Sequence, residues 1–162
     1  MERAEIEHAL EEAFDQALVF HGFADLMRDY DVYIYAPSAP SSAVPPEHLR
    51  YRFTHCVRAT VTTGIRAEVW ARSLDERLTD FETFKRTDDL EGFVWGVKWQ
   101  DLYPGISLLP ASQETERWST ALGMPFHEVQ IETNVHVISL IFADLIVSTV
   151  EPGHAAFVVP GK

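Results

Sequence analysis

The sequence predicts an α+β fold in a single domain, with a largely antiparallel sheet, an N-terminal helix and one or two further helices packed on one face. The 162 residues fit one domain of ordinary size. Several segments alternate between apolar and polar residues, as half-buried strands do, and they are not separated by the long crossovers that a parallel sheet requires. Two other segments repeat apolar residues at the three- and four-residue spacing of amphipathic helices.

The N-terminal part predicts a helix, a strand and a loop, in that order. Apolar residues at helical spacing, among them Ile6 and Leu10, indicate a helix over about residues 3–20. The aromatic and β-branched run at residues 30–35 is typical of a strand. Four prolines and three serines then fall within residues 37–48. Because proline removes backbone donors and fixes φ, we expect a loop there.

A strict alternation over residues 50–62 predicts one long strand with an apolar face and a polar face. Tyr51, Phe53 and His55 fall on the apolar face. The polar face carries three arginines: Arg50, Arg52 and Arg58.

The middle of the chain predicts two helices and one strand. A capping box predicts a short helix over residues 74–84, and an aromatic run predicts a strand over residues 92–99. The second helix should cover Gln113–Leu122, because Ser112 is a favourable N-cap and Gly123 suits the position after the last turn.

Residues 126–150 return to a strand pattern. The first half alternates, whereas residues 138–150 are nearly all apolar, as a central strand covered on both faces would be. A tight turn near Thr133 and Asn134 would divide the segment into a hairpin, and the pattern leaves both arrangements open. A short C-terminal tail follows.

Residues 50–64 align without gaps with residues 139–153, and Phe53 then stands opposite Phe142. Such an internal similarity arises either from duplication of a strand that occupies similar places in one sheet or by chance among apolar strands.

Several short runs resemble the YxiG-like domain of uncharacterised bacterial proteins. These runs are Gly22–Phe23, Met27–Val32, Tyr51–Cys56, Ser73–Asp75, Gly92–Val97, Tyr103–Gly105 and Glu128–Asn134. The resemblance covers about residues 14–150. It implies a bacterial single-domain protein and no particular activity, cofactor or catalytic residue.

Composition excludes several classes of function. The net charge of −12 argues against a general nucleic-acid binder and against a protein of anionic membrane surfaces. The single cysteine, Cys56, excludes an intrachain disulfide and a multi-cysteine zinc site. The N-terminus does not have the pattern of a secretory signal, and the apolar stretch at residues 137–150 is too short to span a bilayer. The cytoplasm is therefore the expected location.

The three arginines are the main candidate ligand-binding residues. Together they could hold a phosphate or carboxylate, with His55 and His136 as further ligand-binding candidates. The competing interpretation pairs the arginines with carboxylates across the sheet, such as Glu128 and Glu132.

The histidines and the cysteine do not form a catalytic or metal-binding pattern. Adjacent side chains of a strand point to opposite faces, so His55 and Cys56 cannot form a catalytic pair with each other. The sequence also lacks the spacing that would place two histidines on one helical turn around a metal. We therefore predict no catalytic residue, no metal site and no cofactor.

These observations favour a non-enzymatic interaction or binding module of the bacterial cytoplasm. Its partner would be another protein or a second copy of the chain. The alternative is a small enzyme or an anionic-ligand-binding protein that uses the surface around Arg50, Arg52 and Arg58.

Overall fold

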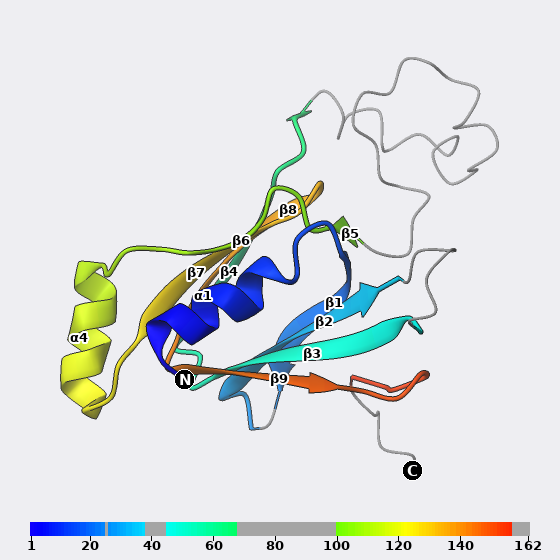
Figure 1. The fold of residues 1–162 in the computed structure, drawn as a ribbon. Helices are drawn as coiled ribbons and strands as arrows, with labels where there is room; N and C mark the ends of the chain where they lie inside the picture. Colours follow the sequence, from blue (N-terminus) through cyan, green and yellow to red (C-terminus); the bar gives the residue numbers. More distant parts are fainter. Residues whose placement is uncertain (25, 38–44, 68–99, 157–162) are drawn as a thin grey trace, which may run out of the picture.

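The computed structural model describes residues 1–24, 26–37, 45–67 and 100–156 (Figure 1). It contains two antiparallel sheets and two helices, which confirms the α+β class. The prediction of one sheet was wrong, because the described strands divide into a five-stranded sheet A and a four-stranded sheet B. The helices are α1 (Arg3–Glu11) and α4 (Gln113–Leu122).

Sheet A has the order β5-β1-β2-β3-β9. Its strands are β5 (Gln100–Asp101), β1 (Ala17–Ala24), β2 (Asp29–Ala36), β3 (Glu47–Thr54) and β9 (Asp144–Thr149). Sheet B has the order β4-β8-β7-β6. Its strands are β4 (Arg58–Thr63), β8 (His136–Phe142), β7 (His127–Glu132) and β6 (Gly105–Leu108).

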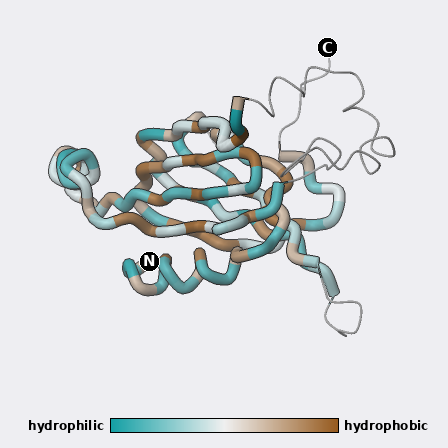
Figure 2. The backbone as a smooth tube through the Cα atoms, turned by 90° about the horizontal axis from the view of Figure 1, so that it is seen from above, coloured by the Kyte–Doolittle hydropathy of each residue, from teal (hydrophilic) through white to brown (hydrophobic). Residues whose placement is uncertain are grey.

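The main core lies between the two sheets. Buried side chains of both sheets meet there, and α1 lies along β6 and directs Ile6 and Leu10 into the same core. Figure 2 shows the apolar residues running along the strands, whereas the two helices are mostly hydrophilic. The alternating patterns therefore identified the correct inner residues, including Phe53 and Ile131, which are fully buried.

The predicted long strand over residues 50–62 is instead two strands in different sheets. The chain turns at His55, whose φ is 48°, and leaves sheet A for sheet B. Backbone bonds to two other segments hold the corner: the Cys56 N–H donates to the Arg28 oxygen (2.8 Å) and the Val57 N–H to the Ile141 oxygen (2.9 Å). The sequence alternation continues through the corner, so it gave no sign of the turn.

Residues 126–150 form three strands. The hairpin alternative is confirmed for β7 and β8, where the Thr133 N–H donates to the His136 oxygen (2.9 Å). A second change of sheet follows at Ala143, which leads into β9 at the edge of sheet A. The prediction of a strand covered on both faces was therefore wrong for β9, where Ile146 is 47% exposed.

The internal similarity does not place its two copies in one sheet. Residues 50–54 lie in β3 of sheet A and residues 139–142 lie in β8 of sheet B. Each copy nevertheless leads into a change of sheet, and the aligned residues Phe53 and Phe142 pack edge to face with ring centroids 4.9 Å apart.

The N-terminal helix is shorter than predicted. It ends at Glu11, and the stretch predicted as its second half becomes β1. Tertiary pairing overrides the helical spacing here: the Asp15 N–H donates to the Leu102 oxygen (3.0 Å), and the Leu102 N–H donates to the Gln16 oxygen (2.9 Å). These bonds start a strand before another helical turn can form.

The helix over Gln113–Leu122 is confirmed with both of its caps. The Ser112 side chain accepts a hydrogen bond from the Thr115 N–H, and Gly123 has the left-handed φ of 66° that ends a helix. The strand expected at residues 30–35 is confirmed as β2.

Three other predictions concern residues that the structure describes in part or not at all. The helix over residues 74–84 and the strand over residues 92–99 lie outside the described residues. Within the predicted loop 37–48, Pro37, Pro45 and Pro46 lie outside strands and β3 begins at Glu47. The single-domain organisation stays a prediction.

A small polar cluster lies on the inner side of the sheets. The Tyr30 hydroxyl and His21 Nδ1 are 2.7 Å apart, and burial raises the pKa of Tyr30 to about 12, so the phenol keeps its proton and can donate. His136 Nδ1 lies 3.1 Å from Gln100 Oε1, which also accepts from the Thr133 hydroxyl (2.6 Å). Burial, and to a smaller extent the charge of His136, lowers the pKa of His21.

Among the residues that the structure describes, no helix is long and apolar enough to cross a membrane.

Replacing Phe142 by alanine should lower the free energy of unfolding by about 3–5 kcal/mol. The side chain is fully buried and packs against Phe53 where the two sheet-changing segments meet. Urea denaturation measures the loss. The exposed Val61→Ala variant should change stability by less than about 0.5 kcal/mol. A loss below about 1 kcal/mol for Phe142→Ala would show that this contact does not hold the sheets together.

The free energy of unfolding should fall as the pH is lowered from about 7.5 to about 5.5. Because the pKa of His21 is lowered in the folded state, its stability contribution is complete above the ordinary value of about 6.5 and is lost below it, where the unfolded chain gains the proton. Burial lowers the pKa of His127 in the same direction. His21→Gln should therefore reduce the pH dependence without abolishing it.

Urea denaturation at the two pH values measures this effect. The matched control is His8→Gln, because the His8 side chain is exposed on α1, and this variant should keep the wild-type pH dependence. An unchanged dependence in His21→Gln would contradict the assignment to His21.

Candidate functional site

The outer face of sheet A, which we call the arginine face, brings together two of the predicted site residues. Inward-pointing residues such as Tyr51 and Phe53 fill the core, so Arg50 and Arg52 point to the other side of β3. Two cross-strand rows make up the face. They are Gly22, Asp31, Arg52 and Ile146 in one row and Phe20, Tyr33, Arg50 and Ser148 in the next.

Asp31 and Arg52 form the tightest contact of the arginine face. The Arg52 Nε and Nη2 atoms each donate to one carboxylate oxygen of Asp31, both at 2.8 Å. Asp31 is 2% exposed, and the Arg52 side chain is 18% exposed. Burial raises the pKa of the Asp31 carboxyl, while the Tyr33 hydroxyl and the Arg50 charge lower it. The two-pronged bond from Arg52 supplies the positive charge that a buried carboxylate needs.

Aromatic side chains enclose this ion pair. The Phe20 ring packs over Gly22, where an added Cβ would lie 3.6 Å from the ring, an ordinary van der Waals distance. The Tyr33 hydroxyl donates to Asp31 Oδ2 (3.2 Å) and its ring packs 6.2 Å from that of Phe20. Burial and the charge of Asp31 raise the pKa of Tyr33, so its phenol stays protonated and can donate.

Arg50 differs from Arg52 in having no ion pair with any described residue. Its charge and a side-chain hydrogen bond to Tyr33 partly offset the rise in the pKa of that tyrosine. The Nε atom of Arg50 and the Oγ atom of Ser148, its neighbour on β9, are both buried without a hydrogen-bond partner. Arg50 is thus the one predicted arginine whose charge is not already neutralised by the described chain.

The chain after β9 folds back over this face. Gly153 has a φ of 83°, and the His154 N–H donates to the Glu151 oxygen (3.0 Å), which closes a turn. The His154 ring then stacks on Tyr33 with centroids 5.5 Å apart, and its Nε2 lies 3.4 Å from the Tyr33 hydroxyl. The tail therefore contributes a further polar ring to the arginine face.

Arg58 lies elsewhere, because the corner at residues 55–57 carries it into sheet B. It forms ion pairs with Glu114 of α4 and Glu128 of β7, and it donates to the Ser139 hydroxyl (3.0 Å). The expected pairing with Glu128 is therefore confirmed for this arginine. Its role is to attach α4 to the outer side of sheet B, and the prediction that it shares a face with Arg50 and Arg52 was wrong.

His55 lies at the corner beside Asp29, next to the arginine face. The His55 N–H donates to Asp29 Oδ1 (3.0 Å), and Arg28 donates to both oxygens of the same carboxylate (3.1 and 3.3 Å). Burial by itself would raise the pKa of Asp29, but these hydrogen bonds outweigh it and the pKa falls below its usual value. The His55 backbone therefore has a structural role at this position.

Two other sequence candidates do not join the arginine face. His136 lies in the inner polar cluster with Gln100 and Thr133. Cys56 is 7% exposed, donates to the Arg58 oxygen (3.2 Å), and has a pKa raised by burial to about 12. The thiol is therefore protonated at neutral pH, which does not fit a nucleophile.

The sequence analysis missed Asp31, Tyr33, Ser148 and His154 as members of this face. A signal existed for Asp31, since a carboxylate in the middle of an otherwise apolar strand requires a partner when it is buried. His154 gave no such signal, because the turn at Gly153 places it and no residue pattern specifies where the tail returns.

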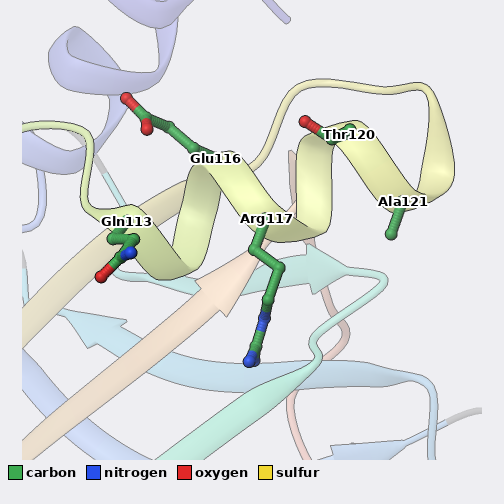
Figure 3. A pocket seen from close by; sticks show the side chains of 5 residues that line it. All are labelled: Gln113, Glu116, Arg117, Thr120 and Ala121. Carbon is green, nitrogen blue, oxygen red and sulfur yellow. The ribbon is translucent and has the colours of Figure 1, made fainter.

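A shallow hollow on α4 is the other surface feature with polar lining. Its lining residues are Gln113, Glu116, Arg117, Thr120 and Ala121, and Figure 3 shows their side chains leaving the helix in different directions. Within the described ranges, no three histidine, cysteine or acidic side chains gather closely enough to hold a metal ion.

Comparisons with known proteins concern family and fold. No curated protein matches the chain. A crystal structure of an uncharacterized protein from Neisseria gonorrhoeae is similar over 83% of this chain and 90% of that one, with 8% identity and a TM-score of 0.39. That similarity is too weak to support an argument. The family model described as YxiG-like protein matches residues 2–160, nearly the whole length, so the chain belongs to the YxiG-like family.

Proposed function

We propose that this protein is a non-enzymatic interaction module of the bacterial cytoplasm that binds an acidic surface of a partner protein through the arginine face. The observation that carries the proposal is the guanidinium of Arg50, which forms no ion pair with a described residue and lies among exposed aromatic and aliphatic side chains. Phe20 is 41% exposed and Ile146 is 47% exposed on either side of it. Arginine and aromatic side chains dominate the binding energy of protein interfaces.

Charge complementarity supports an acidic partner. The chain as a whole carries −12, but Asp31 already forms its ion pair with Arg52, and Arg50 forms none with the described residues of this face. A carboxylate of a partner could take a two-pronged hydrogen bond from the guanidinium and would meet little local negative charge. Neither of the two described helices, α1 and α4, lies over this face (Figure 1).

Reversing the charge of Arg50 should abolish or strongly weaken partner binding. The partner is first captured from the native host with the wild-type protein and then purified. Its affinity for Arg50→Glu should fall at least about tenfold, which corresponds to about 1.4 kcal/mol. Isothermal titration calorimetry measures the change.

Arg117→Glu is the matched control, because it makes the same charge change on the exposed side of α4. It should bind as the wild type does. Equal affinity of the wild type and Arg50→Glu would refute the proposal, and so would equal losses in both variants, which would indicate an effect of net charge alone. Arg50→Gln provides a milder variant whose folding is checked by circular dichroism.

The alternative function is binding of a small anion at the same place. The guanidinium of Arg50 favours it, since it can donate to a phosphate or carboxylate oxygen, and its Nε atom and the Oγ atom of Ser148 have no hydrogen-bond partner among the described residues. Inorganic phosphate should then cause saturable NMR shifts around Arg50 in the wild type and none in Arg50→Gln or Ser148→Ala. Saturable shifts of this kind, without any captured protein, would favour the alternative over the protein partner.

A further inference from the structure

The free edge of sheet A offers a second binding surface. Among the described strands, β9 is the last one of this sheet and has β3 as its single neighbour (Figure 1). The Val150 N–H donates to the His48 oxygen (2.8 Å), which shows which residues of β9 form backbone hydrogen bonds with β3. The even-numbered residues of β9 therefore turn their backbone groups toward β3, and Leu145, Val147 and Thr149 turn theirs outward.

Most of the outward backbone groups have no partner. The Leu145 N–H is satisfied by Asp144 Oδ1 (2.9 Å). The N–H and C=O groups of Val147 and Thr149 make no hydrogen bond within the described ranges. An extended edge with open donors and acceptors is a template for a further strand.

This edge also lacks the features that normally protect edge strands. Residues 145–149 contain no proline and no charged side chain. Ile146 and Val147 are 47% and 37% exposed on opposite sides of the strand. Natural proteins usually place lysine, proline or a short irregular strand at such a position to prevent pairing.

Resting on the proposed role as an interaction module, we infer that β9 pairs antiparallel with β9 of a second copy of this chain. A two-fold axis at Val147 makes the segment complementary to itself. Val147 then exchanges two hydrogen bonds with its own counterpart, and each Thr149 N–H donates to the Leu145 oxygen of the other copy. Four bonds form while the bond within each copy from the Leu145 N–H to Asp144 is kept.

The same register keeps the two Asp144 carboxylates apart. It places the two Asp144 side chains six residues apart along the paired strands, about 20 Å, which exceeds the Debye length of about 8 Å at physiological salt. The segment between them is uncharged. Two five-stranded sheets thus join into one, and the exposed apolar side chains next to the edge become partly covered.

The mass of the protein in solution tests this inference. Light scattering coupled to size exclusion should give twice the mass of one chain for the wild type. Val147→Lys should give the mass of one chain, because the charge would have to be buried against its own counterpart. Val61→Lys is the matched control, since Val61 is 45% exposed on another edge strand, β4, and this variant should remain a dimer.

A wild type that stays monomeric as its concentration rises, or a Val147→Lys variant that remains dimeric, would overturn the inference. Hydrogen exchange provides a measurement that does not depend on any variant. The Val147 and Thr149 amides should be protected in concentrated wild-type protein and should lose this protection on dilution, and unprotected amides at both concentrations would also overturn it. Arg50→Glu should keep the dimer, so a loss of partner binding through the arginine face and a loss of self-association are measured separately.

Discussion

The arrangement of this molecule depends on two neighbouring places where the chain leaves one sheet and enters the other. β3 leads from sheet A to β4 of sheet B, and β8 leads from sheet B to β9 of sheet A. Because β3 pairs with β9 and β4 pairs with β8, the two crossings lie side by side and in opposite directions. The buried rings of Phe53 and Phe142 meet between them, so one aromatic contact connects both sheets.

The crossings decide which arginines can act together. Arg52 and Arg58 are close in the sequence and were predicted on the same face of one strand. Because the corner separates them, Arg52 forms its ion pair with Asp31 in sheet A, whereas Arg58 pairs with Glu114 and Glu128 on the outer side of sheet B. Both become structural ion pairs whose charges are neutralised. Arg50 precedes the corner and lies on the outer face of sheet A, where it forms no ion pair with a described carboxylate. The position of the corner, rather than arginine content, therefore defines the candidate site.

Sequence patterns predicted those features that neighbouring residues determine. The helix Gln113–Leu122 follows from Ser112 and Gly123, whose capping preferences act within one turn. The inward-pointing residues of β3 could be predicted from the alternation of apolar and polar residues, because successive side chains of a strand point to opposite faces. The corner at His55 could not be predicted, because it is held by backbone bonds to Arg28 and Ile141, which are distant in the sequence. The candidate site depends on that corner, so sequence found Arg50 but missed its surroundings.

The four edge strands of the described sheets differ in how far neighbouring elements or their own side chains protect them. The β6 edge of sheet B has α1 beside it, whereas β4 is rich in threonine and carries one exposed valine. On sheet A, β5 covers the start of β1 with two residues only, and β9 is uncharged with open backbone groups. An acidic chain of net charge −12 resists association over most of its surface, since copies repel one another. The two proposed binding surfaces, the β9 edge and the face around Arg50, lie where local charge is absent or reversed, and both belong to sheet A.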